Sequence, residues 1–208
     1  MKRRLLAALA AVVIMFAGAS TASAEFRYGP SLGLTYNDLM WKQDLFTVDK
    51  TMGFSAGIIG EKMFPGIGFG VDIGLFYEMR GAKLHMGEKP MWEYMGLGTV
   101  DMRLHTLVIP VHVRFKYTRL NGVEDKIAPL LFLGPSLGIL VGHSDSKGAL
   151  KYSGADLGLD FGLGAEIFRK WQVTAGYTLG VTEACKGNML TNFTARNSVW
   201  TFKVSYLF

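Results

Sequence analysis

The sequence predicts an all-β fold, an eight-stranded antiparallel up-and-down transmembrane β-barrel, and three observations predict it. The last segment, 197–208, alternates large apolar or aromatic residues with small or polar ones, so one face of a strand is apolar. The chain ends on an aromatic residue, Phe208. It is 50% hydrophobic and only 19% charged, against about 25% charged in soluble domains, yet after the first 24 residues no apolar run is long enough for a membrane-spanning helix. A closed barrel is the remaining structure that crosses lipid with every backbone group paired.

The first 24 residues are expected to be a secretory signal peptide. Three basic residues at positions 2–4 precede an apolar core of 15 residues, 5–19, and the small residues Ala-Ser-Ala at 22–24 fit a cleavage site. The core is shorter than the ~20 apolar residues that a membrane helix needs, and a retained anchor helix is the alternative. We therefore expect a signal peptide over 1–24 and one outer-membrane β-barrel domain over 25–208.

Eight later segments alternate apolar residues with small or polar ones, as strands of a membrane barrel do. They are expected at 26–36, 51–60, 69–80, 104–117, 127–141, 155–168, 171–181 and 197–208. The connections between them alternate long and short, which is typical of extracellular loops and periplasmic turns and puts both termini on the periplasmic side. The alternative, a soluble barrel with its apolar face inside, is disfavoured because charged residues alternate with apolar ones on nearly every strand. Outward aromatic residues should form two girdles, Phe69, Tyr117, Trp171 and Phe208 at the periplasmic rim and Tyr36, Tyr77 and Trp200 near the outer rim.

The small-residue face of these strands should line the lumen and carry a structural network of charges. The interior of an eight-stranded barrel is just wide enough for side chains to fill, and buried charges persist there only when they are paired. A path for protons or ions is the alternative interpretation of the same residues. The expected network consists of Arg27, Asp72, Glu78, Arg80, His112, Arg114, Lys116, Asp156, Asp160, Glu166 and Lys203.

No catalytic, cofactor-binding or metal site is expected. The segment 134–138 reads Gly-Pro-Ser-Leu-Gly and fits the hydrolase pattern G-x-S-x-G, but no helix follows it and Ser136 should point into the lumen. The four histidines show no metal-ligating spacing. A lipid-processing enzyme would need a Ser–His pair near the outer leaflet, for which His143 and Ser144 are the only candidates. Without the leader, 19 Lys and Arg face 17 Asp and Glu, and this net charge of +2 is not typical of nucleic-acid binding.

The connection 81–99 is rich in methionine and aromatic residues and should reach outside the membrane. Exposed side chains of these kinds can form an adaptable surface for a partner protein. The alternative is that they pack on strands that extend beyond the bilayer. The candidate partner loop consists of Met86, Met91, Trp92, Tyr94 and Met95. The single cysteine, Cys185, excludes an intramolecular disulfide.

Five segments from residue 102 onward resemble successive blocks of the PorT-type outer-membrane β-barrel family. They read MRLHTLVIPVHVRFKY, APLLFLGPSLGIL, ADLGLDFGLGAEIF, QVTAGYTLGV and NSVWTFKVSYLF. The resemblance covers 100–208 by motif and 26–80 by architecture alone. It implies a small integral barrel of the OmpA and OmpX size class, without shared catalytic residues. It also allows a role in protein secretion across the outer membrane, to which the founding member of the family is linked.

These observations together predict a non-enzymatic integral protein of the bacterial outer membrane with a closed polar lumen. Its role would be structural, or would depend on contact with other surface or secretion proteins; a lipid-processing enzyme and a narrow solute channel are the alternatives. The expected partners are outer-membrane lipid, the barrel-insertion machinery, which reads Phe208 as part of an insertion signal, and envelope or secretion proteins. We expect no nucleic-acid partner and no cofactor, and we expect the protein to be a monomer.

Overall fold

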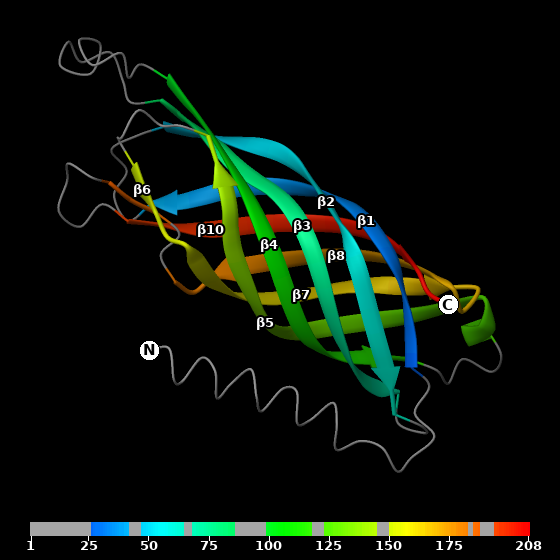
Figure 1. The fold of residues 1–208 in the computed structure, drawn as a ribbon. Helices are drawn as coiled ribbons and strands as arrows, with labels where there is room; N and C mark the ends of the chain where they lie inside the picture. The colour runs from blue at the N-terminus through cyan, green and yellow to red at the C-terminus, as the bar shows by residue number, and fades with distance from the viewer. Residues whose placement is uncertain are drawn as a thin grey trace, which may run out of the picture.

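A computed structural model shows one antiparallel sheet that closes on itself into a barrel (Figure 1). The structure describes residues 26–41, 47–64, 68–85, 99–117, 123–144, 150–182, 185–187 and 194–208. The eight strands of the wall are β1 (Phe26–Trp41), β2 (Thr47–Met63), β3 (Phe69–His85), β4 (Thr99–Lys116), β5 (Ile127–His143), β7 (Ala155–Ile167), β8 (Trp171–Gly180) and β10 (Thr194–Tyr206).

Each wall strand pairs with the next wall strand along the chain, and β10 pairs with β1 to close the barrel. The closing register runs from Ser31 opposite Ser205 to Trp41 opposite Ala195. This is the up-and-down topology that the alternating pattern predicts, and the predicted fold class is confirmed.

The boundaries of several predicted segments were wrong. β2 continues through Met63, so Glu61 lies in a strand rather than in a connection. β7 ends at Ile167, because Phe168 and Arg169 adopt positive φ angles of 53° and 57° in the turn that follows. A left-handed conformation cannot continue a strand.

Two predicted loops contain short strands, β6 (Leu150–Tyr152) and β9 (Cys185–Gly187). They pair with each other, and β9 also pairs with the first residues of β10. Three residues are too few to show a period of two, which is why the sequence pattern did not reveal them. The leader 1–24 and the candidate partner loop at 86–95 lie outside the described residues.

Both ends of the described chain lie at the same end of the barrel (Figure 1). There the backbone N–H of Phe208 donates to the carbonyl oxygen of Tyr28 at 2.9 Å. The same end carries the turn 168–170 and the short 3-10 helix η1 (Val123–Asp125). The opposite end carries β6 and β9. The described residues include no helix that is both long and apolar enough to cross a membrane.

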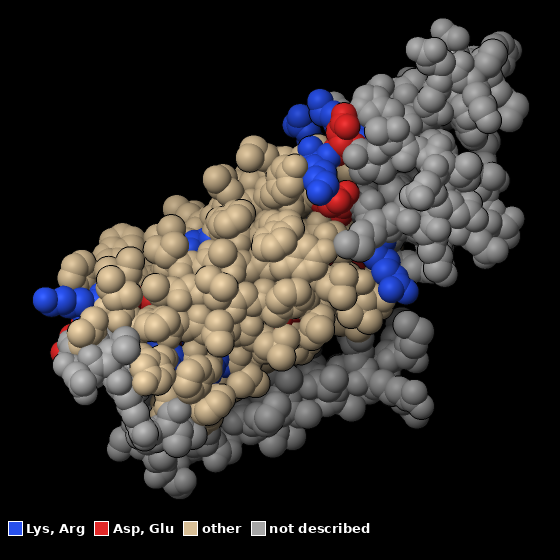
Figure 2. Space-filling model, turned by 180° about the vertical axis from the view of Figure 1, so that it is seen from behind, with Lys and Arg blue, Asp and Glu red and all other residues tan. Residues whose placement is uncertain are grey.

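The wall is apolar on the outside and polar on the inside, the reverse of a soluble protein. Leu32, Met52 and Leu163 are exposed by 66%, 77% and 61%. Figure 2 shows a face on which charged side chains gather near the ends of the wall and most of the surface between them is uncharged. The aromatic residues expected at the two rims all face outward and are exposed or half-exposed.

Candidate functional site: the charged lumen

Glu61, on β2, is the centre of an ion-pair cluster at the end of the lumen nearest the termini. Its carboxylate accepts hydrogen bonds from Arg27 at 2.5 Å, Arg114 at 2.7 Å and Lys116 at 2.9 Å. The Nε2 of Gln172 donates to it as well, at 2.8 Å. Because these partners lie on β1, β4 and β8, one fully buried carboxylate connects four strands across the lumen.

Glu166, on β7, is the second acceptor of this cluster. It accepts from Arg27 at 2.7 Å, from Lys116 at 2.6 Å and from Gln172 Nε2 at 2.9 Å. The other end of the Gln172 amide accepts from Arg114 Nη1 at 2.5 Å. The amide therefore uses both its donor and its acceptor, as a buried polar group must.

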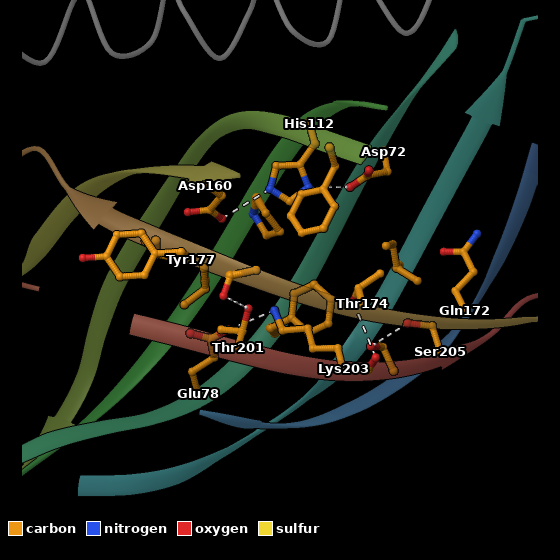
Figure 3. A pocket seen from close by; sticks show the side chains of 18 of the residues that line it. Asp72, Glu78, His112, Asp160, Gln172, Thr174, Tyr177, Thr201, Lys203 and Ser205 are labelled. Carbon is orange, nitrogen blue, oxygen red and sulfur yellow. Dashed lines mark hydrogen bonds and ion pairs between the residues drawn. The ribbon is translucent and has the colours of Figure 1, made fainter. Parts of the chain in front are cut away.

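A second group lies in the middle of the lumen, around His112 (Figure 3). His112 Nδ1 is 2.9 Å from Asp72 Oδ1, and Nε2 is 3.3 Å from Asp160 Oδ2. A doubly protonated imidazole ring can donate a hydrogen bond to a carboxylate from each nitrogen, and this geometry suits it. Arg114 Nε donates to Asp72 at 2.8 Å, which joins this group to the Glu61 cluster.

A third group lies toward the end of the lumen remote from the termini. Glu78 accepts from Arg80 Nη2 at 2.9 Å and from Lys203 Nζ at 3.1 Å. Arg80 also contacts Asp156 at 3.4 Å, and Asn197 donates to the same carboxylate at 3.3 Å. Lys203 lies over the ring of Phe76, 3.9 Å from its centroid, a cation–π geometry.

Buried apolar side chains also lie in the lumen. Ile59, Phe76 and Val108 are almost fully buried, and they face the lumen. Among the described residues, a cavity bordered by His112 and Lys203 has a volume of about 40 Å³ (Figure 3). Such a volume holds a few water molecules at most.

All eleven ionisable residues of the expected network face the lumen, and the structure adds Glu61. The ionisable residues described on the inner face then number six basic and six acidic. The basic groups are Arg27, Arg80, His112, Arg114, Lys116 and Lys203, and the acidic groups are Glu61, Asp72, Glu78, Asp156, Asp160 and Glu166. Glu61 could have been found by continuing the inward series Gly53, Ser55, Gly57, Ile59 by one step. Gln172 was expected on the inner face, but a criterion based on charge does not select it.

The candidate catalytic residues take other roles in this geometry. Ser136 is 3% exposed in an unbroken strand, and its hydroxyl donates to Asp160 Oδ1 at 2.7 Å. Ser144 Oγ accepts from the backbone N–H of Arg103 at 2.9 Å, while His143 Nδ1 lies 3.2 Å from the carbonyl oxygen of Ser144. Among the described residues no group of three His, Cys, Asp or Glu side chains could hold a metal ion.

Comparison with known proteins agrees with this architecture. A family model described as "Outer membrane protein beta-barrel domain" matches residues 16–185. No curated protein matches the chain significantly. The outer membrane protein OprG of Pseudomonas aeruginosa is 14% identical, over 88% of this chain and 94% of that one, with a TM-score of 0.52. At this identity the likeness shows the fold alone.

Two further solved structures are similar to the chain at lower TM-scores. Ail, the attachment invasion locus protein of Yersinia pestis, is 15% identical over 88% of this chain and 99% of its own, with a TM-score of 0.46. The outer membrane protein W of E. coli is 15% identical over 90% of this chain and 100% of its own, with a TM-score of 0.45.

Proposed function

We propose that this chain is a non-enzymatic structural protein of the envelope whose lumen is closed to solutes. The chain belongs to the outer membrane protein beta-barrel domain family. It lies in the bacterial outer membrane, where its apolar wall contacts lipid. One observation carries the proposal: in the described part of the lumen, paired charges and buried apolar side chains surround a cavity of about 40 Å³. Water-filled channels occur in barrels of 16–18 strands, whose interior is too wide for side chains to fill.

Planar-bilayer recording of the purified protein tests the closed lumen. The native protein should show no stable step of current, and a stable step would overturn the proposal. Replacing both inward rings that line the cavity, Phe76→Ala with Phe132→Ala, should produce leakage, because side-chain volume closes the lumen. Replacing two outward rings, Phe69→Ala with Phe115→Ala, makes the same change in composition and should leave the barrier intact.

The burial of Ser136, which is 3% exposed inside the lumen, supports the absence of enzymatic activity. A nucleophilic serine needs a general base at its hydroxyl and access to substrate. We expect Ser136→Ala and the double variant His143→Ala with Ser144→Ala to leave the lipid composition of the outer membrane unchanged. A change in the acyl chains or headgroups in either variant would favour a lipid-processing enzyme instead.

We also infer that the end of the barrel with β6 and β9 faces the outside and contacts other envelope or secretion proteins. Long connections lie on the extracellular side in barrels of this type, and the PorT-type resemblance favours a secretion component as the partner. A photo-crosslinking residue in place of Trp92 should capture a discrete partner in intact cells. The same residue in place of Lys126, which lies at the other end of the barrel, should not capture that partner.

A further inference from the structure

A cluster of basic side chains lies on the outer wall at the end remote from the termini. We define the basic rim site as Lys50 on β2, Lys83 on β3 and Arg103 on β4. Lys50, Lys83 and Arg103 are exposed, on three adjacent strands. Figure 2 shows basic side chains, with acidic ones among them, gathered at one end of the wall.

The basic rim site lies where the outer face changes from apolar to charged. On β3 the outward series runs Leu75, Tyr77, Met79, Gly81 and then Lys83. The site therefore lies just beyond the apolar band, at the depth where lipid headgroups meet the hydrocarbon.

The pairing of β2 with β3 is irregular at this position, and a cavity lies beside the irregularity. Lys50 pairs with Ala82, but the next pair in the register is Ser55 with Glu78. Four residues of β2 thus face three residues of β3, as in a β-bulge. A cavity of about 350 Å³ lies beside the bulge, within the size range of small-ligand pockets.

The lining of this cavity combines apolar and basic side chains. Met52 and Met79 line it together with the three residues of the basic rim site. Thr51, Gly81 and Arg80, which belongs to the lumen network, complete the lining.

Three nearby acidic residues have to be considered: Asp38 lies 3.5 Å from Lys50, and Asp49 on β2 and Asp101 on β4 both pair in register with Lys83. The ion pair between Lys50 and Asp38 is largely exposed, and exposed ion pairs are weak and exchange readily for a more highly charged anion.

We propose that the basic rim site binds the phosphate group of an outer-leaflet lipid headgroup. Arginine and lysine donate charge-assisted hydrogen bonds to phosphate oxygens. The methionines would contact the first carbons of the acyl chains. A free phosphate ion would gain nothing from the methionine side chains of the lining, and this favours a lipid as the source of the phosphate. The proposal rests on the inferred orientation of the barrel and does not depend on whether the lumen is closed.

Binding of bisphosphorylated lipid A, compared with dephosphorylated lipid A, tests the site. Native mass spectrometry of the full barrel in detergent would measure both affinities. The native protein should prefer the phosphorylated lipid by about tenfold or more, the factor that one charge-assisted hydrogen bond provides. The triple variant Lys50→Gln, Lys83→Gln, Arg103→Gln should lose that preference.

The matched control is Lys62→Gln, Lys126→Gln, Lys170→Gln, which removes the same charge at the opposite end and should keep the preference. The heat-dependent shift in electrophoretic mobility would show that each variant is folded. If the triple variant does not fold, Lys50→Gln and Arg103→Gln should each weaken the preference on their own. Equal binding of the two lipids, an unchanged triple variant, or an equal loss in the control would overturn the proposal. Displacement of the lipid by an equal concentration of inorganic phosphate would identify a site for the free ion and would also overturn it.

Discussion

Glu61 illustrates how a single buried carboxylate compensates several cations in the lumen. Its carboxylate is fully buried and accepts hydrogen bonds from three cations and one amide. An unpaired buried cation is far less stable than a paired one, because the cation has lost its water and gained nothing in return. Glu61 and its partners are therefore interdependent.

We expect Glu61→Gln to lower the free energy of unfolding by about 3–5 kcal/mol, because the neutral amide leaves Arg27, Arg114 and Lys116 undercompensated. Urea unfolding of the refolded protein, followed by tryptophan fluorescence, would measure the change. The control is Asp125→Asn, which removes an exposed ion pair with Arg169 and should change the same quantity by less than ~1 kcal/mol. Equal effects of the two substitutions would contradict the central role of Glu61.

The sequence predicts which residues face the lumen. It does not predict which of them contact one another there. A period of two assigns His112 and Asp160 to the inner face whatever the rest of the fold is. Their contact depends on which strands face each other across the barrel and on the stagger between them. For the same reason the sequence could not reveal that His112 lies between two carboxylates on different strands.

At the scale of the element, the interrupted pairing of β2 with β3 is supported from a third strand. Thr35 Oγ1, on β1, donates to the carbonyl oxygen of Met79 at 3.0 Å, and Asn37 Nδ2 reaches the carbonyl oxygen of Thr51 at 3.2 Å. These side chains reach over β2 at Gly53. A Cβ atom at Gly53 would lie 1.9 Å from the Met79 carbonyl oxygen and 2.6 Å from Thr35 Oγ1. Glycine is therefore required here for close approach.

We expect Gly53→Ala to lower the free energy of unfolding by about 1–3 kcal/mol, the usual effect of overpacking. Gly142→Ala is the matched control, since the nearest atom to its added Cβ would be 3.7 Å away and the contact is ordinary. The control should change the free energy of unfolding by no more than about 0.5 kcal/mol. The urea midpoints of unfolding of the two variants, measured side by side, would show whether their stabilities differ. A Gly142→Ala variant as unstable as Gly53→Ala would refute the requirement for glycine at position 53.

The middle of each wall strand could be predicted and its outer end could not. Within the apolar band the wall must alternate between lipid and lumen, so 69–80 reads unambiguously as a strand. Beyond the band polar residues occur on both faces and the apolar alternation is lost, as at the buried Asn37 and its neighbour Asp38 in the outer part of β1. The bulge between Lys50 and Ser55 also shifts the register of β2 against β3 by one residue, which no uniform period can reveal.

For the whole molecule, closure of the barrel depends on the last residues of the chain. β10 is paired on both sides, with β8 and with β1. The N–H of the buried Leu207 donates to the carbonyl oxygen of Lys170 at 2.8 Å, while Phe208 bonds across the seam to Tyr28. The Phe208 ring is 66% exposed and lies 5.1 Å from the ring of Tyr206 and 6.0 Å from that of Tyr28. Its backbone closes the seam, and its ring remains accessible on the outer surface.

Because the ring is exposed, we expect Phe208→Ala to affect assembly in the cell more than the stability of the finished barrel. The variant should refold in detergent as the native protein does, since its backbone bond to Tyr28 is retained. In cells it should yield much less folded barrel, because the aromatic terminus would be the feature that the insertion machinery reads. The heat-dependent mobility shift, measured on outer-membrane fractions and on refolded protein, separates the two effects. Phe69→Ala, which removes another exposed outward ring, should assemble normally in both assays. Equal assembly of the two variants in cells would refute the insertion signal, and a refolding defect in Phe208→Ala would assign the ring to stability instead.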